Sequence, residues 1–140
     1  MKTKYLIIGN SAGGIGAAEA IREVDQNGAL TIVGEEPYAA YSRPLISKYV
    51  TGEYDPDGMR IRPADFYDKH CIELKLGHKA YKMDIAKRTV TLDDGAEIGY
   101  EKLLLATGGK PIIPKMDGMG KVGIFNFINL ADAIKLEEYL

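Results

Sequence analysis

A glycine-rich turn between an apolar run and a helix-forming segment is the feature that most constrains this chain. Residues 4–8 are apolar and β-branched, residues 9–14 read Gly-Asn-Ser-Ala-Gly-Gly, and residues 17–24 have helical composition. A second apolar run follows at residues 30–33, with Glu35 and Glu36 directly after it. This order predicts a β-α-β unit of about 30 residues, in which the N–H groups of the turn and of the helix N-terminus face a pyrophosphate.

The turn matches the G-x-G-x-x-G pattern with one substitution. Gly9 and Gly14 take the outer positions, Gly13 lies beside Gly14, and Ser11 replaces the middle glycine. The middle position needs a close backbone approach to phosphate, and the Ser11 hydroxyl can itself reach a phosphate oxygen. A carboxylate about 20 residues further on can accept both hydroxyls of a ribose, and Glu35 has this spacing. A glycine-rich turn in an ordinary α/β domain is the alternative.

Length and composition indicate a single globular domain and argue against several classes of protein. A chain of 140 residues is expected to form one domain with a real core. The net charge is −2 and the Lys and Arg residues are scattered, which favours neither a nucleic-acid surface nor a membrane-binding face. No run approaches the length of a membrane span, so a cytoplasmic location is expected. Cys71 is the single cysteine, which excludes an internal disulfide, and the two histidines have no metal-ligand spacing.

The remaining pattern completes an α/β prediction. We expect helices at residues 14–24, 44–50, 63–70 and 130–140, the last capped by Asn129. Strands are expected at residues 72–76, 80–83, 89–92 and 97–100, the last three forming a β-meander laid against the main unit, with a tight turn at residues 93–95. Residues 103–106 read as a strand buried on both faces. The pattern therefore predicts an α/β fold of the Rossmann-like, dinucleotide-binding kind, with a parallel sheet, helices and a small β-meander.

Three further residues have weak local signals. Arg43 can meet a diphosphate bidentately, and Lys48 lies about one helical turn further on. Local composition alone favours a solvated surface loop for both. Thr107 follows the apolar run at the carboxyl end of a strand, where ligands bind in open α/β sheets, although a strand that simply ends at Gly108 fits equally well.

Together these segments resemble the N-terminal FAD-binding half-domain of the pyridine nucleotide-disulfide oxidoreductase superfamily. The resemblance is carried by residues 9–14, 35–37, 41–44, 47–48, 91–95 and 100–108, in the order of the family and over nearly the whole chain. The chain is similar in particular to rubredoxin and ferredoxin reductases, NADH oxidases and the flavin domain of nitrite reductase. The resemblance favours a functional role for Arg43 and Lys48 over a solvated surface loop, and for Thr107 over a strand that simply ends at Gly108.

The resemblance also implies a set of contacts with FAD. The pyrophosphate would be bound by the glycine turn, and the adenosine ribose by Glu35 with Glu36 beside it. Arg43 would contact the pyrophosphate or ribityl region, and Lys48 would lie near the isoalloxazine without being a catalytic residue in the strict sense. Adenine would touch the backbone of Ala80. The flavin-side phosphate and ribityl would be covered by Ala106, Thr107 and Gly108.

Two departures from the family pattern shape the functional prediction. Some branches carry a redox cysteine near position 42, where this chain has Ser42, so cysteine-based peroxidase, oxidase or disulfide reductase mechanisms are disfavoured. The NAD(P)H domain and the later Gly-Asp segment of the family do not occur within residues 1–140. We therefore expect an incomplete FAD-binding domain, inactive alone, of an enzyme that passes hydride from NAD(P)H to flavin and electrons to a protein or small-molecule acceptor. A non-catalytic nucleotide-binding module, a subunit of a split enzyme and an ordinary NAD-binding dehydrogenase domain are the alternatives.

Overall fold

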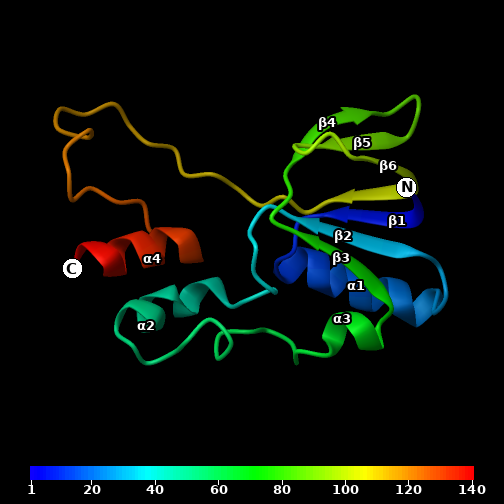
Figure 1. The fold of residues 1–140 in the computed structure, drawn as a ribbon, viewed down its shortest axis with the longest axis horizontal. Coiled ribbons are helices and arrows are strands. Elements are labelled where there is room, and N and C mark those ends of the chain that lie inside the picture. Colours follow the sequence, from blue (N-terminus) through cyan, green and yellow to red (C-terminus); the bar gives the residue numbers. More distant parts are fainter. The chain divides into compact units, whose positions relative to one another are not determined.

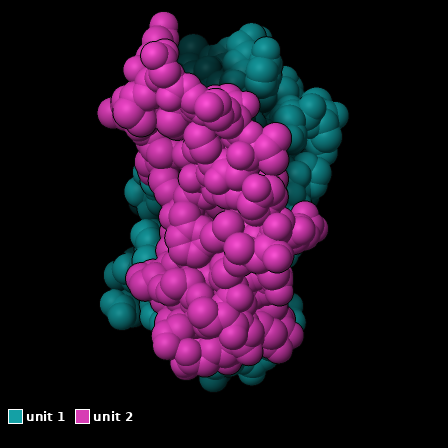
Figure 2. All heavy atoms as spheres, turned by 90° about the vertical axis from the view of Figure 1, so that its left-hand side faces the viewer, with its two compact units in different colours: residues 1–40, 61–108 teal, residues 41–60, 109–140 magenta.

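The computed structural model describes all residues from 1 to 140 and divides them into two compact units. Residues 1–40 and 61–108 make up the first unit, and residues 41–60 and 109–140 make up the second. Figure 2 shows the atoms of the first in teal and of the second in magenta. The glycine turn, Glu35 and residues 106–108 belong to the first unit, whereas Arg43 and Lys48 belong to the second.

A six-stranded sheet with the order β3-β2-β1-β6-β5-β4 is the centre of the first unit (Figure 1). Its strands are β1 (Lys2–Ile8), β2 (Leu30–Gly34), β3 (Ile72–Leu76), β4 (Ala80–Asp84), β5 (Thr89–Leu92) and β6 (Glu97–Leu105). Strands β3, β2, β1 and β6 run parallel, and β5 and β4 continue the sheet antiparallel. Helix α1 (Ala12–Val24) connects β1 to β2, so the predicted β-α-β unit and fold class are confirmed.

Alternating residues of the central strands build a core on each face of the sheet. Ile7 and Ile32 point to the face covered by α1, where Ile15 and Ala18 are fully buried. Leu6 and Val33 point to the opposite face and pack against the strands of the meander, in a cluster completed by Ile8, Val90, Leu92, Ile98 and Tyr100. This period-two alternation fixes the register of the sheet, because a slip of one residue would exchange its two faces.

Two helix predictions in the first unit need correction at their beginnings. Helix α1 begins at Ala12 rather than at residue 14, so the last two glycines of the turn lie within its first turn. Helix α3 (Phe66–Lys69) is shorter than the predicted residues 63–70. Pro63 is outside the helix, and its carbonyl accepts a hydrogen bond from the Phe66 N–H at 3.1 Å as a turn. Pro63 therefore begins a turn that leads into the helix.

Strand β6 differs more strongly from the prediction. The strands expected at residues 97–100 and 103–106 are one continuous strand, because pairing with β1 runs from Gly99 to Leu105. Through β6 the meander belongs to the main sheet. Leu104 and Leu105 are 40% and 58% exposed, so the apolar end of this strand is not buried on both faces.

The second unit contains a 3₁₀ turn, η1 (Arg43–Leu45), and two helices, α2 (Ile46–Val50) and α4 (Leu130–Tyr139). The helix predicted at residues 44–50 thus begins as a 3₁₀ turn and is α-helical only from Ile46. The two helices pack on each other, and Leu130 and Ala133 of α4 are fully buried. Asn129 caps α4 as predicted, since its side chain accepts a hydrogen bond from the Asp132 N–H at 2.8 Å. The Leu130 N–H donates to the Tyr41 hydroxyl at 2.8 Å. None of the helices in the structure has the length and apolar character needed to cross a membrane.

Candidate functional site

The glycine turn is packed so closely that side chains are excluded at two of its positions. Gly9 has a φ of +123°, and a Cβ there would collide with the carbonyl oxygen of Ala106. A Cβ on Gly14 would collide with the carbonyl oxygen of Gly9. The Ala106 N–H donates to the Ile8 carbonyl at 2.8 Å, which holds the end of β6 against the turn. The structure thus brings the predicted residues Gly9, Gly14 and Ala106 together.

The N-terminus of α1 continues this turn. Ser11 is the N-cap residue, but its side chain makes no capping hydrogen bond. The first turn of the helix holds no acidic residue. The partial positive charge of the helix N-terminus is therefore not neutralised from within the helix, and backbone N–H groups there suit the phosphates of a nucleotide. The packing of the turn and the donors of this helix end fit the diphosphate of FAD or of another dinucleotide.

Glu35 and Glu36 follow the carboxyl end of β2, on the same side of the sheet as the glycine turn. The Glu35 side chain is 61% exposed, and its Oε1 atom lies 3.3 Å from the Nζ of Lys79. The chain before β4 runs alongside, since the His78 N–H donates to the Gly34 carbonyl at 3.1 Å and the Gly77 N–H to that of Glu36 at 3.3 Å. Ala80 begins β4 directly after Lys79. The predicted ribose and adenine residues are therefore close together.

Arg43 and Lys48 belong to the second unit, and their predicted contacts with FAD stay predictions. Lys48 Nζ lies 2.5 Å from Glu53 Oε2, and this hydrogen bond raises the pKa of Lys48 above its ordinary value. The roles of Thr107 and Gly108 likewise stay predictions. Gly108 has a φ of +69°, in the left-handed region that favours glycine.

Three residues without a role predicted from the sequence border the site. Lys79 pairs with Glu35, and Asn10 and Tyr67 share a hydrogen bond of 2.9 Å. Lys79 and Asn10 each neighbour a predicted site residue in the chain, which is the only sequence signal for them. Tyr67 is 57 residues from Asn10, and no sequence pattern links the two.

His78 lies beside two carboxylates at the edge of the meander. Its Nδ1 atom is 3.4 Å from Asp94 Oδ2 and 3.8 Å from Asp93 Oδ1. The potential ligand atoms of the three side chains lie within 4.8 Å of one another. Backbone N–H groups already occupy part of this cluster, because Lys79 donates to Asp93 and Ala96 donates to Asp94. These backbone contacts show that the two carboxylates also cap the turn of the meander.

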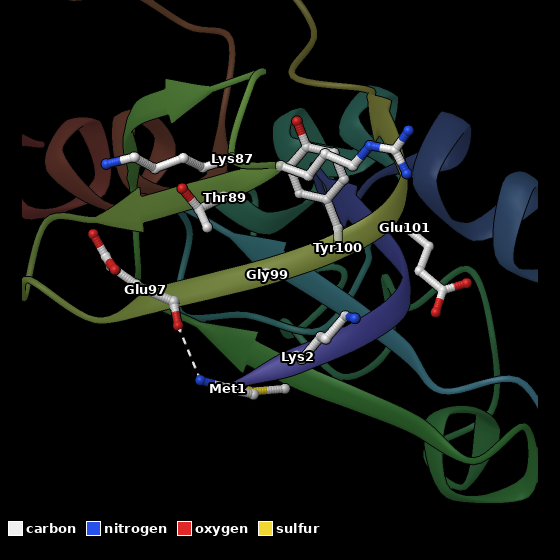
Figure 3. Close-up of a pocket in the computed structure, with 9 residues that line it drawn as sticks. Met1, Lys2, Lys87, Thr89, Glu97, Gly99, Tyr100 and Glu101 are labelled. Atoms are coloured by element: carbon white, nitrogen blue, oxygen red, sulfur yellow. Dashed lines mark hydrogen bonds between the residues drawn. The ribbon is translucent and has the colours of Figure 1, made fainter.

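A pocket of about 420 Å³ lies at the other end of β1, away from the glycine turn (Figure 3). Lys2, Lys87, Gly99 and Tyr100 contribute to its lining. The N-terminal ammonium of Met1 donates to the Glu97 carbonyl there at 3.2 Å. No residue of the candidate site lines this pocket, because the candidate site lies at the carboxyl ends of the parallel strands.

Asp25, after the C-terminus of α1, is at the centre of a hydrogen-bond network. Its Oδ2 atom accepts hydrogen bonds from Lys4 Nζ at 2.6 Å and from the Tyr5 hydroxyl at 3.0 Å. Its Oδ1 atom accepts from the N–H of Gly28 at 2.8 Å. Lys4 foremost, and then Gly28 and Tyr5, hold the pKa of the Asp25 carboxyl far below its usual range. This network closes the loop between α1 and β2.

Comparisons with known proteins agree with this geometry. A family model described as pyridine nucleotide-disulphide oxidoreductase matches residues 3–140. The NADH-dependent phenylglyoxylate dehydrogenase subunit epsilon of Aromatoleum evansii is 34% identical over 96% of this chain and 32% of its own length. Rhodocoxin reductase of Rhodococcus erythropolis is also 34% identical, over 85% of this chain and 28% of its own.

A solved structure shows the same fold. The crystal structure of NADH:rubredoxin oxidoreductase from Clostridium acetobutylicum superposes with a TM-score of 0.88 at 29% identity, over 99% of this chain and 35% of that one. The chain therefore spans about a third of the length of these relatives.

Proposed function

Since the chain belongs to the pyridine nucleotide-disulphide oxidoreductase family, we propose that it is the FAD-binding portion of an NAD(P)H-dependent flavin oxidoreductase. The observation that carries this proposal is the closely packed glycine turn, joined to the end of β6 on one side and followed by Glu35 at the end of β2. Backbone donors for a diphosphate and a carboxylate for a ribose are the two requirements of an ADP moiety.

The residues of this chain bind and orient the cofactor in this proposal. Gly9, Ser11, Gly13 and Gly14 hold the pyrophosphate, and Glu35 with Glu36 holds the adenosine ribose. Ala80, the segment 106–108, Arg43 and Lys48 contribute the further contacts described above. Bound FAD supplies the hydride and electron-transfer chemistry, with NAD(P)H as the co-substrate.

The NAD(P)H site and the segment that completes the FAD domain lie outside residues 1–140 in this proposal. Strand β6 supports it, because β6 pairs with β5 only through residues 97–99 and has no strand neighbour on that edge at residues 101–105. An unpaired edge with exposed Leu104 and Leu105 suits a further strand. The second candidate is a protein that acts as one subunit of a larger enzyme, as the name of the Aromatoleum relative says of that protein.

The test is the cofactor content of the full-length protein. We expect the purified protein to show the absorbance of oxidised flavin, and the flavin bands to bleach anaerobically when NADH or NADPH is added. A protein acceptor of the rubredoxin or ferredoxin kind should then restore them. Release of NAD and no flavin on denaturation would instead support an ordinary dehydrogenase domain. Flavin that no nicotinamide reduces, with or without a co-purified partner, would support a non-catalytic binding module.

A further inference from the structure

The hydroxyl of Tyr67 joins two segments that are far apart in the sequence. It donates a hydrogen bond to Asn10 Oδ1 at 2.9 Å and accepts one from the Ala40 N–H at 3.0 Å. The Asn10 side chain also donates from Nδ2 to the Tyr38 carbonyl at 3.3 Å. These groups form one connected network within the first unit.

The two segments that meet at Tyr67 carry the two halves of the candidate site. Asn10 lies between Gly9 and Ser11 in the phosphate-facing turn. Tyr38 and Ala40 lie in the segment that follows Glu35, on the ribose side. The network therefore fixes the distance between a diphosphate site and a ribose site.

Packing holds Tyr67 itself in place. Its neighbour Phe66 is 3% exposed in the core below α1, and the Tyr67 ring packs against the same core. The two rings meet edge to face, with centroids 5.3 Å apart. Ala40, which donates to the hydroxyl, is also 3% exposed. Because the ring is packed on several sides, the position of its hydroxyl is fixed, and its hydrogen bond to Asn10 can position the glycine turn.

Asn10 also packs closely against the end of β2. A Cβ placed on Gly34 would come within 3.0 Å of the Asn10 Cβ. The side chain thus lies over the last residue of the strand that leads into Glu35, and its amide points to the segment beyond.

We propose that Tyr67 and Asn10 are positioning residues that hold the glycine turn and the segment after Glu35 at the separation required by the ADP moiety of the cofactor. This inference rests on the proposed function and adds residues that touch no ligand themselves. A ligand that spans both halves benefits from their alignment, because its second contact is made within an already bound complex. A ligand that contacts only the ribose side gains nothing from it.

The experiment compares two ligands on one variant of the full-length protein. Tyr67→Phe keeps the ring and its packing but removes the hydroxyl. After removal of bound cofactor, we expect its affinity for ADP to fall by about three- to tenfold, the effect of one or two lost hydrogen bonds. Its affinity for adenosine, measured by ligand-observed NMR, should stay within about twofold of the wild type, since adenosine has no phosphate. The readout is thus the ratio of the two affinities.

Two further variants separate positioning from general destabilisation. Asn10→Ala removes the link from the side of the turn and should change the ratio equally, and the double variant should show no additional loss. Tyr5→Phe, which removes a hydroxyl bonded to Asp25 at the far end of the sheet, is the matched control. We expect it to lower the melting temperature without changing the ratio.

The affinities for ADP and adenosine decide whether Tyr67 and Asn10 have this positioning role. Equal losses for ADP and adenosine, or no loss in Tyr67→Phe, would overturn it while the proposed function stands. A wild-type protein that binds neither ADP nor FAD would overturn the proposed function and the inference together.

Discussion

Glu35 and Lys79 form an exposed ion pair at the ribose side of the candidate site, and exposed pairs contribute little to folding. Glu35→Gln should therefore leave the melting temperature nearly unchanged while it weakens FAD binding. We expect a loss of roughly 1.5–3 kcal/mol, the usual range for hydrogen bonds to a charged group, measured by calorimetry on the cofactor-free protein.

The control for Glu35 is a second exposed pair on the neighbouring strand β3. Glu73 Oε1 lies 3.2 Å from Lys75 Nζ, and Glu73→Gln removes the same charge from a place where we expect no nucleotide. Both variants should keep the wild-type stability, and only Glu35→Gln should lose affinity. An unchanged affinity in Glu35→Gln would transfer the ribose role to Glu36.

Asp25 makes the stability of the chain depend on pH. Because its pKa is lower in the folded than in the unfolded protein, its stabilising effect is complete above the unfolded value of about 4 and is lost as the pH falls below it. The free energy of unfolding should thus decrease more steeply with acidification in the wild type than in Asp25→Asn. Urea denaturation at several pH values between about 5 and 3 measures the two slopes.

The comparison for Asp25 is a carboxylate in the second unit. Asp117→Asn makes the same change of charge and should keep the steep dependence of the wild type on pH. Parallel slopes for the wild type and Asp25→Asn would show that the contacts with Lys4 and Tyr5 do not persist in solution.

At the scale of elements, two glycines of α1 offer a matched pair of variants. A Cβ on Gly14 would collide with the Gly9 carbonyl, whereas a Cβ on Gly16 meets nothing within 4 Å. Gly14→Ala should destabilise the protein and abolish FAD binding, because the turn must open to admit the methyl group. Gly16→Ala should bind FAD normally and gain roughly 0.5–1 kcal/mol of stability as a better helix former. Thermal unfolding and an FAD titration of both variants test this, and normal binding by Gly14→Ala would place the phosphate elsewhere.

The strands show what the sequence could and could not predict. Residues 30–33, 72–76 and 89–92 have regular apolar patterns, and their strands were predicted to within a residue. For β6 the sequence predicts two strands, with Glu101 and Lys102 between them. In the structure, pairing with β1 carries the strand through both charged residues. Tertiary pairing thus overrides local composition, and a single sequence does not record pairing.

In the candidate site, too, some residues follow from local spacing in the sequence, and others come together only through tertiary packing. Gly9, Gly14 and Glu35 were predictable because their spacing along one β-α-β unit determines their geometry. The contact between Gly9 and Ala106 follows from the parallel pairing of β1 and β6, and that between Glu35 and Lys79 from the path of the chain into β4. Tyr67 reaches Asn10 from a short helix that the sequence placed only approximately. Such contacts depend on the packing of the whole unit.

At the scale of the whole molecule, residues 1–140 contain one glycine-rich strand–turn–helix unit and therefore one expected nucleotide site. Hydride transfer needs nicotinamide and flavin held in contact, and such proximity is worth up to ~7–11 kcal/mol of a reaction barrier. We expect a protein made of residues 1–140 alone to bind FAD weakly, with ADP competing almost as well as FAD. It should show no substantial NADH-dependent reduction of an artificial acceptor, whereas the full-length protein, assayed in parallel with added FAD, should turn over. Saturable turnover by residues 1–140 would mean that these residues hold both nucleotides by themselves, and that the proposed division of the enzyme is wrong.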